Sequence, residues 1–202
     1  MYIVDTGPVL KFFATNTERW FFGALAGQPI HAPQAVCAEV FDVPRRRPQF
    51  SSAPDVWRKV APKLIVELPD DPTPALEQAA RDVLRQDLEA VQRVRQDLGE
   101  KMALLHASVE AQVGREVVLC CDDGPAQQLI AREAARLRRL SVPGSIQVVD
   151  SIQILRWAIE AGAIKDKAIL RQRYDRMAGL DESLPKNIRS TPLLDSPPWP
   201  SR

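Results

Sequence analysis

The sequence predicts an α/β protein: a three-layer α/β/α sandwich whose central sheet has about five, mostly parallel, strands. Three observations lead to this prediction. Short apolar runs alternate with longer stretches in which apolar residues recur every three or four positions, as in amphipathic helices. The run 116–121 (EVVLCC) is apolar almost throughout, as expected for a strand covered on both faces. Strands that alternate with helices indicate βαβ units and a parallel sheet.

The element boundaries follow from turn and capping signals along the chain. Prolines and arginines in 44–62 indicate a loop or a decoration. Apolar residues at steps of three and four then predict one long helix over 75–96. The expected strands span 2–4, 30–32, 63–68, 116–121 and 146–149, and the expected helices begin near 8, 33, 75, 100, 126, 152 and 165.

Composition sets the class of protein and its expected compartment. The chain has 202 residues, of which 45% are hydrophobic and 26% are charged, and its net charge is +1. These values fit a globular domain that buries a core without disulfides, and the three cysteines are expected to be reduced. No run approaches the ~20 apolar residues of a membrane span, and Asp5 interrupts the first apolar run. We therefore expect a cytoplasmic protein with no membrane partner.

The chain is expected to form one domain with an appended tail. Residues 1–180 would form the domain, with an extended helical and loop insertion around 44–96. Four prolines after residue 190 mark 181–202 as a Pro-rich C-terminal tail, which we expect to be loosely ordered.

Carboxylates stand at the ends of several predicted strands, where ligands of open α/β sheets bind. Asp5 follows the first strand, Asp122 and Asp123 follow the fourth, and Asp150 follows the fifth. The sequence shows no matching cluster of His, Cys, Ser or Lys there. Converging carboxylates raise one another's pKa, and a hard divalent cation removes that penalty. A cluster that binds Mg²⁺ or Mn²⁺ suits the hydrolysis of a phosphodiester.

Four stretches, in order, resemble the motifs of PIN-domain ribonucleases, in a VapC-toxin-like variant with a double Asp and an LGE motif. They are IVDTGPVL (3–10), AVCAEV (35–40), DLGEKMAL (97–104) and VLCCDD (118–123). The first resembles the opening motif, the second the Glu-containing helix, the third the "LGExxAxxLA" form and the fourth the double-Asp form. The match covers about residues 1 to 162, and four motifs in order are more specific than any one of them.

The resemblance implies a PIN-like fold, Mg²⁺ or Mn²⁺ at an acidic pocket, and RNA as substrate. By position, the implied metal ligands and catalytic residues are Asp5, Glu39, Glu100 and one of Asp122 and Asp123. Thr6 would support the site from the first turn, and Asp97 would share a helix face with Glu100. The function implied is a metal-dependent endoribonuclease, which in VapC-type members is a toxin silenced by an antitoxin protein.

Other interpretations of the same residues stay open. Asp5 could be a helix N-cap, and the double Asp before Gly124 could be a turn signal. The chain could be a catalytically inactive PIN-like scaffold for RNA or protein, or a nuclease acting on DNA. An aspartic protease, which shares the Asp-Thr-Gly triplet, is disfavoured because that fold is all-β. Apolar helices within residues 8–25 could also form a homodimer.

Two groups of arginines are candidate phosphate contacts, and such contacts would make RNA affinity salt-dependent. One group is Arg45, Arg46 and Arg47 in a loop, and the other includes Arg132 and Arg136 on a helix. Tryptophans could stack on bases, but Trp20 and Trp157 lie in apolar helices and are expected in the core.

Overall fold

The central sheet has five parallel strands in the order β3-β2-β1-β4-β5, as shown by the computed structural model. The structure describes residues 1–195 and 199. The strands are β1 (Tyr2–Val4), β2 (Ile30–Pro33), β3 (Ile65–Leu68), β4 (Glu116–Cys120) and β5 (Ser145–Val149). From β1 the chain adds strands first on one side and then on the other, so the direction of strand order reverses between β1 and β4. The predicted α/β class is confirmed.

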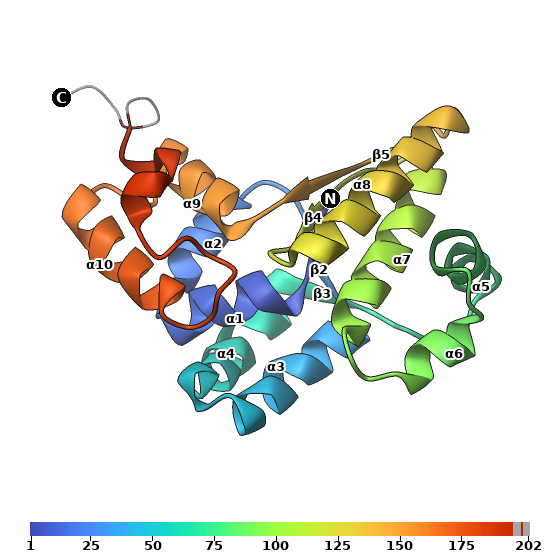
Figure 1. The fold of residues 1–202 in the computed structure, drawn as a ribbon, viewed down its shortest axis with the longest axis horizontal. Coiled ribbons are helices and arrows are strands. Elements are labelled where there is room, and N and C mark those ends of the chain that lie inside the picture. The colour runs from blue at the N-terminus through green and yellow to red at the C-terminus, as the bar shows by residue number, and fades with distance from the viewer. Residues whose placement is uncertain (196–198, 200–202) are drawn as a thin grey trace.

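Helices cover both faces of the sheet (Figure 1). Helices α1, α2, α4 and α9 pack on one face, and α7 and α8 pack on the other. The short helices α5 and α6 lie outside α7. The bounds are α1 (Thr6–Ala14), α2 (Glu18–Ala24), α3 (Gln34–Arg46), α4 (Ala53–Leu64), α5 (Pro74–Ala79), α6 (Leu88–Arg93), α7 (Leu98–Gln112), α8 (Gly124–Arg139), α9 (Ser151–Glu160) and α10 (Lys167–Ala178).

The strand register aligns buried side chains into rows that face one helix layer or the other. Val4, Cys120 and Val149 are aligned across β1, β4 and β5 and belong to the larger core under α1 and α9. The neighbouring row includes Ile3 and Leu119, which belong to the core under α7 and α8. Because successive strand residues point to opposite faces, a continuous apolar strand fills both cores. This is the pattern that the apolar run in β4 predicted.

The long helix predicted over 75–96 is wrong. The segment forms α5, a single π-helical turn (Ala80–Leu84) and α6, with a left-handed backbone at Arg85, where φ is +58°. Leu76 and Leu88, from the two halves, pack in one small cluster against α7. The apolar spacing continues through the break because both halves cover the same helix.

The loop predicted over 44–62 is also wrong, because helices occupy most of it. Pro44 lies in the last turns of α3, and Pro54 lies in the first turn of α4. A first-turn proline costs a helix no hydrogen bond, since the N–H there has no helical partner. Trp57 and Phe50 from this segment are buried in the larger core. Their burial stabilises helices in a segment whose prolines suggested a loop.

The C-terminal segment packs on the larger core rather than being loosely ordered. Residues 188–190 and 192–194 form 3₁₀ turns, and Leu184, Ile188 and Leu193 are buried. Their burial removes apolar area from water, which stabilises an ordered path for the segment. Of the four prolines that suggested a tail, the last three lie outside the described residues.

Candidate active site

The predicted acidic residues gather where the strand order reverses. Asp5 directly follows β1, and its backbone N–H donates to the carbonyl of Cys120 at the end of β4 (3.0 Å). Asp122 and Asp123 follow β4, and Glu39 and Glu100 approach from α3 and α7. In doubly wound sheets, ligands bind outside the carboxyl ends of the strands at this reversal. The fold therefore brings together all five predicted ligands from four separate segments.

Asp5 is a buried carboxyl group with one oxygen unsatisfied. Its Oδ2 accepts from the N–H of Gly7 (3.2 Å), so Asp5 also caps α1, but Oδ1 has no hydrogen-bond partner among the described residues. Burial, which leaves 3% of the residue exposed, raises its pKa to about 7 against the lowering effect of nearby backbone N–H groups, and the charges of Glu39 and Asp122 raise it further. The N-cap interpretation is correct and does not exclude a role as ligand.

Glu39 is held in place by two donors from the neighbouring motifs. Its Oε2 accepts from the hydroxyl of Thr6 (2.5 Å), and its Oε1 accepts from the backbone N–H of Gly99 (2.9 Å). A Cβ at Gly99 would lie 2.5 Å from Oε2 of Glu39, so only glycine lets the start of α7 approach this carboxylate. Thr6 therefore positions Glu39, and Gly99 both binds it and leaves room for it.

Glu100, in the first turn of α7, lies close enough to four other carboxylates for their charges to raise its pKa. Burial raises its pKa to about 8, and the charges of Asp5, Asp123, Asp97 and Glu39 add to that rise. Asp97 itself is exposed and makes no side-chain hydrogen bond to the helix that it precedes. It contributes negative charge to the site from outside. The raised pKa of Glu100 thus reflects its burial first and the neighbouring negative charges second.

Asp122 differs from these acids because a buried cation neutralises it. Lys11 of α1, only 1% exposed, lies 2.9 Å from Asp122 Oδ2 and 3.0 Å from Asp181 Oδ2. Asp122 also accepts from the backbone N–H and the hydroxyl of Ser151 at the start of α9, both at 2.7 Å. Burial opposes the charge of Lys11, but the two aspartates outweigh it and raise its pKa.

Asp123 uses only one of its two carboxylate oxygens in a local hydrogen bond. Its Oδ1 accepts from the N–H of Ala126 (2.7 Å) and caps α8, as the turn interpretation required, whereas Oδ2 makes no hydrogen bond to a described residue. Its charge reaches Glu100. The neighbouring thiols of Cys120 and Cys121 are free, and burial raises their pKa, so they are protonated near neutral pH.

The oxygen ligands at this site are of the kind that a hard divalent cation prefers, but their arrangement fits such a cation only in part. An unsatisfied buried carboxylate oxygen on Asp5 and mutually repelling charges at Glu100 are features that Mg²⁺ or Mn²⁺ would compensate. Within the described residues, however, no group of three or more His, Cys, Asp or Glu side chains is arranged so that it could hold a metal ion. Asp5, Glu39, Glu100 and Asp123 are the residues left to bind one, because Asp122 is occupied by Lys11 and Ser151.

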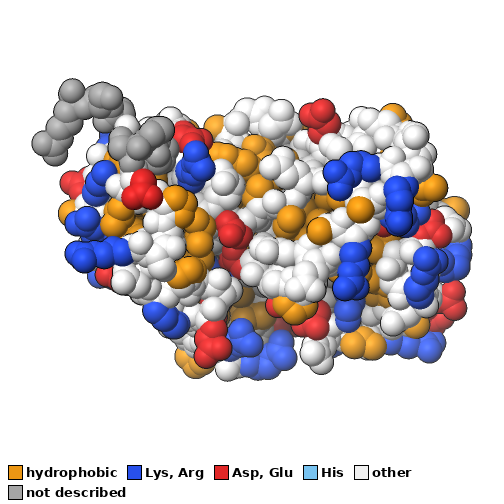
Figure 2. All heavy atoms as spheres, turned by 45° about the horizontal axis from the view of Figure 1, so that its top comes forward, with side chains coloured by type: hydrophobic (Ala, Val, Ile, Leu, Met, Phe, Trp, Pro, Cys, Tyr) orange, Lys and Arg blue, Asp and Glu red, His pale blue; other side chains and the backbone are white. Residues whose placement is uncertain are grey.

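The predicted basic residues are separated on the surface. Arg45, Arg46 and Arg47 are exposed at the end of α3, and Arg45 pairs with Asp42. Arg136 is engaged by Glu133 and Asp82, so it is not available in the way predicted. In contrast, a shallow hollow of about 470 Å³ on α8 is lined by Arg132, Ala135, Arg138 and Arg139. Figure 2 shows basic side chains gathered toward the end of the molecule where α7 and α8 lie.

The residues that neutralise Asp122 or donate hydrogen bonds to it, and the second acid bound to Lys11, were not predicted from the sequence. Lys11 carries a visible signal, since it is a lone lysine between Leu10 and Phe12 in an apolar helix. Asp181 and Ser151 carry none, because their roles depend on contacts with residues far away along the chain. No cluster of Lys or Ser stands at the strand ends, but one lysine of α1 and one serine of α9 contact Asp122.

A carboxylate–imidazole pair, Asp70 and His106, lies beyond β3. Asp70 Oδ1 lies 2.8 Å from Nε2 of His106, and its Oδ2 accepts from the N–H of Ala35 (2.6 Å) in the first turn of α3. The pair fixes the start of the helix that carries Glu39. Its contacts are accounted for by this structural role.

Comparisons with protein-family models, curated proteins and solved structures find no match for this chain. In the part of the chain that the structure describes, no helix has both the length and the apolar character needed to cross a membrane. The site must therefore be interpreted from its own residues.

Proposed function

We propose that this protein is a divalent-metal-dependent endoribonuclease of PIN-like fold. The observation that supports the proposal most strongly is Asp5, a carboxyl group buried at the strand-order reversal with one oxygen unsatisfied and other carboxylates around it. A buried carboxylate without a partner is costly, and a divalent cation would offset that cost. The four motifs that suggested the family supply the residues of this cluster.

In the proposed chemistry, the contacts of each acid decide whether it would bind the cation or position other residues. Asp5, Glu100 and the free oxygen of Asp123 would hold Mg²⁺ or Mn²⁺, with Glu39 oriented toward them by Thr6 and Gly99. When bound, the cation supplies positive charge at the scissile phosphate and activates water for attack. Asp122 would position the surrounding elements rather than bind the cation, because its contacts with Lys11 and Ser151 connect the end of β4 to α1 and to α9.

The substrate and partners follow from the resemblance. RNA is the proposed substrate, and exposed arginines on α8 would contact its phosphates. A cognate antitoxin and a homodimer stay predictions, as does a cytoplasmic location.

A specific observation favours a second function, that of an inactive PIN-like scaffold for RNA or protein. Lys11 supplies an internal positive charge to Asp122, and the described carboxylates are not arranged as a metal site. A scaffold would bind no Mn²⁺ specifically. Calorimetric titration of the protein with Mn²⁺ separates the two functions without measuring cleavage, since a nuclease requires one or two saturable sites.

The proposed nuclease is tested by incubating the protein with total RNA, transfer RNA and single-stranded DNA, with Mn²⁺ or with EDTA. We expect RNA cleavage that needs Mn²⁺ and that falls at least about 100-fold in Asp5→Asn, because a direct ligand should matter more than the outer residues of metal sites. Asp55→Asn, on the exposed surface of α4, is the matched control and should cleave as the wild type does. Equal cleavage by wild type and Asp5→Asn would contradict the site assignment, and preferred cleavage of DNA would contradict the substrate.

A further inference from the structure

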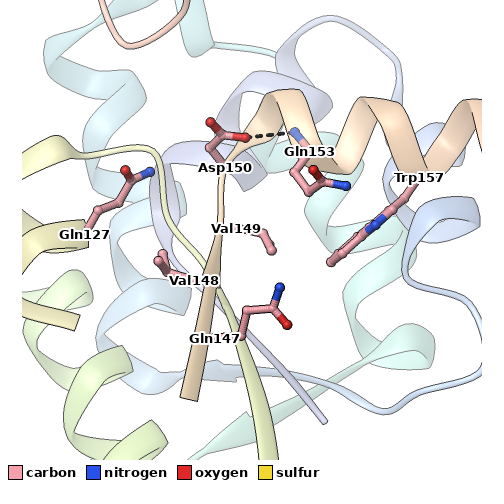
Figure 3. Close-up of a pocket in the computed structure, with 7 residues that line it drawn as sticks. All are labelled: Gln127, Gln147, Val148, Val149, Asp150, Gln153 and Trp157. Carbon is pink, nitrogen blue, oxygen red and sulfur yellow. Dashed lines mark hydrogen bonds between the residues drawn. The ribbon is translucent and has the colours of Figure 1, made fainter. Parts of the chain in front are cut away.

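A cavity of about 400 Å³ lies at the outer edge of β5, outside the carboxylate cluster. Its lining includes Gln127 of α8, Gln147 of β5, and Gln153 and Trp157 of α9 (Figure 3). The volume falls in the range of small-molecule sites. Trp157, expected in the core, is half-buried, packs against the larger core and also borders this cavity. Neither the proposed chemistry nor the fold accounts for the side chains of Gln147 and Gln153 beside an indole.

The sheet register explains how these side chains come together. Gln147 is aligned with Val118 of β4, which is aligned with Tyr2 of β1, so all three point to the face that α9 covers. Trp157 packs beside the Tyr2 ring, with centroids 6.3 Å apart and planes tilted by 59°. Figure 3 shows Gln147 and Trp157 on the same side of β5. The indole is thus anchored by Tyr2 while part of it borders the cavity.

Backbone groups of β5, which is an edge strand of the sheet, also line the cavity. Val149 accepts from Cys121, and Ser145 donates to Arg115, so the polar backbone groups of these two residues point toward β4. In a parallel ladder, successive residues direct their N–H and C=O groups to alternate sides of the strand, so residues 146 and 148 direct theirs away from β4. Val148, which also lines the cavity, therefore presents a donor and an acceptor at the open edge.

The chemistry of the lining selects a planar, uncharged ligand with a hydrogen-bonding edge. The side-chain amides of Gln147 and Gln153 make no hydrogen bond to a described residue, and each offers both donors and acceptors. Asp150 uses Oδ1 to cap α9 through the N–H of Gln153 (2.8 Å), which leaves Oδ2 to accept from an amino group. No Lys or Arg lines the cavity, which disfavours a phosphate there. Amide edges beside an indole face match a nucleobase.

The cavity adjoins the carboxylate cluster through consecutive residues. Asp150 lines the cavity, and Ser151 donates two hydrogen bonds to Asp122. On the other side, Gln127 donates to the carbonyl of Cys121, the residue before Asp122 (2.8 Å). We propose that this cavity binds one base of single-stranded RNA, which stacks on Trp157 and is read by Gln147 and Gln153, so that the strand runs past the carboxylates. The inference rests on the proposed function for its choice of RNA.

The test measures binding without cleavage, by fluorescence anisotropy of labelled eight-nucleotide RNAs (oligo-A, -C, -G and -U) in EDTA. Trp157→Leu should weaken binding about 10-fold, in line with the loss of one stacked base, and Trp157→Phe should retain most of the affinity. Gln147→Leu, at an exposed position, should alter the ranking of the four RNAs. Trp20→Leu and Gln172→Leu, on α2 and α10 and outside the lining of the cavity, are the matched controls and should bind as the wild type does.

Circular dichroism confirms that each variant is folded, and Gln147→Leu keeps the test decisive if Trp157→Leu does not fold. Unchanged affinities in both cavity variants, or no RNA binding by the wild type, would overturn the inference. Binding of a strand-forming peptide that requires Gln147 and leaves RNA binding unaltered would overturn it too, in favour of β-augmentation. Cavity-dependent binding without Mn²⁺-dependent cleavage would support the cavity and contradict the nuclease, and the reverse result would do the opposite.

Discussion

Two groups of acids lie at one edge of the same sheet and differ in how their charge is balanced. In the open group of Asp5, Glu39 and Glu100, a hydroxyl and a backbone N–H hold Glu39 and a backbone N–H donates to Asp5. Burial first, and repulsion second, raise the pKa of Asp5 and of Glu100. The clamped group, Asp122 and Asp181, shares the ammonium of Lys11. The clamped group thus contains its own cation, whereas no salt bridge within the described residues supplies one to the open group.

The largest effect on stability is expected from removing the internal cation of the clamped group. Lys11→Met should lower the free energy of unfolding by about 3 to 5 kcal/mol, because two carboxylates lose their buried partner. Urea denaturation measures the change. The variant Lys11→Met with Asp122→Asn and Asp181→Asn should recover much of the loss, since it removes the stranded charges as well. A Lys11→Met variant as stable as the wild type would show that the clamp contributes nothing.

The open group should make the metal-free protein less stable as pH rises. The pKa values of Asp5 and Glu100 are raised to about 7 and about 8, so the unfolded chain releases these protons first. The stabilisation is therefore complete below about pH 4 and is lost as pH rises to about 8. Denaturation in EDTA at pH 5 and pH 8 measures this loss, which Asp5→Asn should reduce. A more stable protein at pH 8 than at pH 5 would contradict the raised values.

The clamped group should respond to pH in the opposite sense. Burial raises the pKa of Asp181, but Lys11 and hydrogen bonds from Ser183 outweigh burial, and the net pKa is lowered. Its stabilisation is present above the ordinary range of an aspartate and is lost as pH falls below about 4. Asp181→Asn should flatten the acid limb of the stability profile and leave the change between pH 5 and pH 8 unaltered.

A smaller effect on activity is expected at Gly99. Gly99→Ala places a methyl group against Glu39, 2.5 Å from Oε2 and 3.0 Å from the hydroxyl of Thr6. Displacing Glu39 should lower cleavage about 10-fold, as for outer residues of metal sites, while the fold persists. Gly124→Ala, at a helix start with open space around it, is the control. Full activity in Gly99→Ala would show that the position of Glu39 is unimportant.

The smallest effect is expected where an ion pair is exposed. Arg93 and Glu89 lie one helical turn apart on α6, and both side chains are more than two-thirds exposed. Arg93→Ala should change the free energy of unfolding by only about 0.3 to 0.5 kcal/mol. A loss comparable with that of Lys11→Met would show that burial is not what distinguishes the clamp.

The sequence predicts those features that repeat along the chain or follow from strand ends. The parallel sheet and the convergence of Asp5, Asp122 and Asp123 follow from apolar periodicity and from the rule that parallel strands end at one edge. Glu39 and Glu100 lie on helices, and only the resemblance to PIN domains predicts them at the site. The break at Arg85 does not follow, because both halves of the segment pack on one helix and no proline or glycine marks the turn.

The contacts that distinguish the two groups of acids could not be predicted. Asp181 reaches Lys11 only because the segment after α10 packs on the core, and Pro-rich composition suggested that it would not. Trp157 and Gln147 lie together only because β5 ends the sheet in the observed register. Contacts between distant segments depend on how elements pack, and single-sequence patterns do not contain that information.

The position of β1 between β2 and β4 has a consequence for the timing of synthesis. Tyr2 and Val4 pair with Val118 and Cys120, so the first strand has one neighbour missing until much later residues have left the ribosome. A growing chain that carries Asp5, Glu39 and Glu100 still lacks β4 and Asp123. The proposed site therefore cannot be complete until β4 and the residues that follow it have left the ribosome.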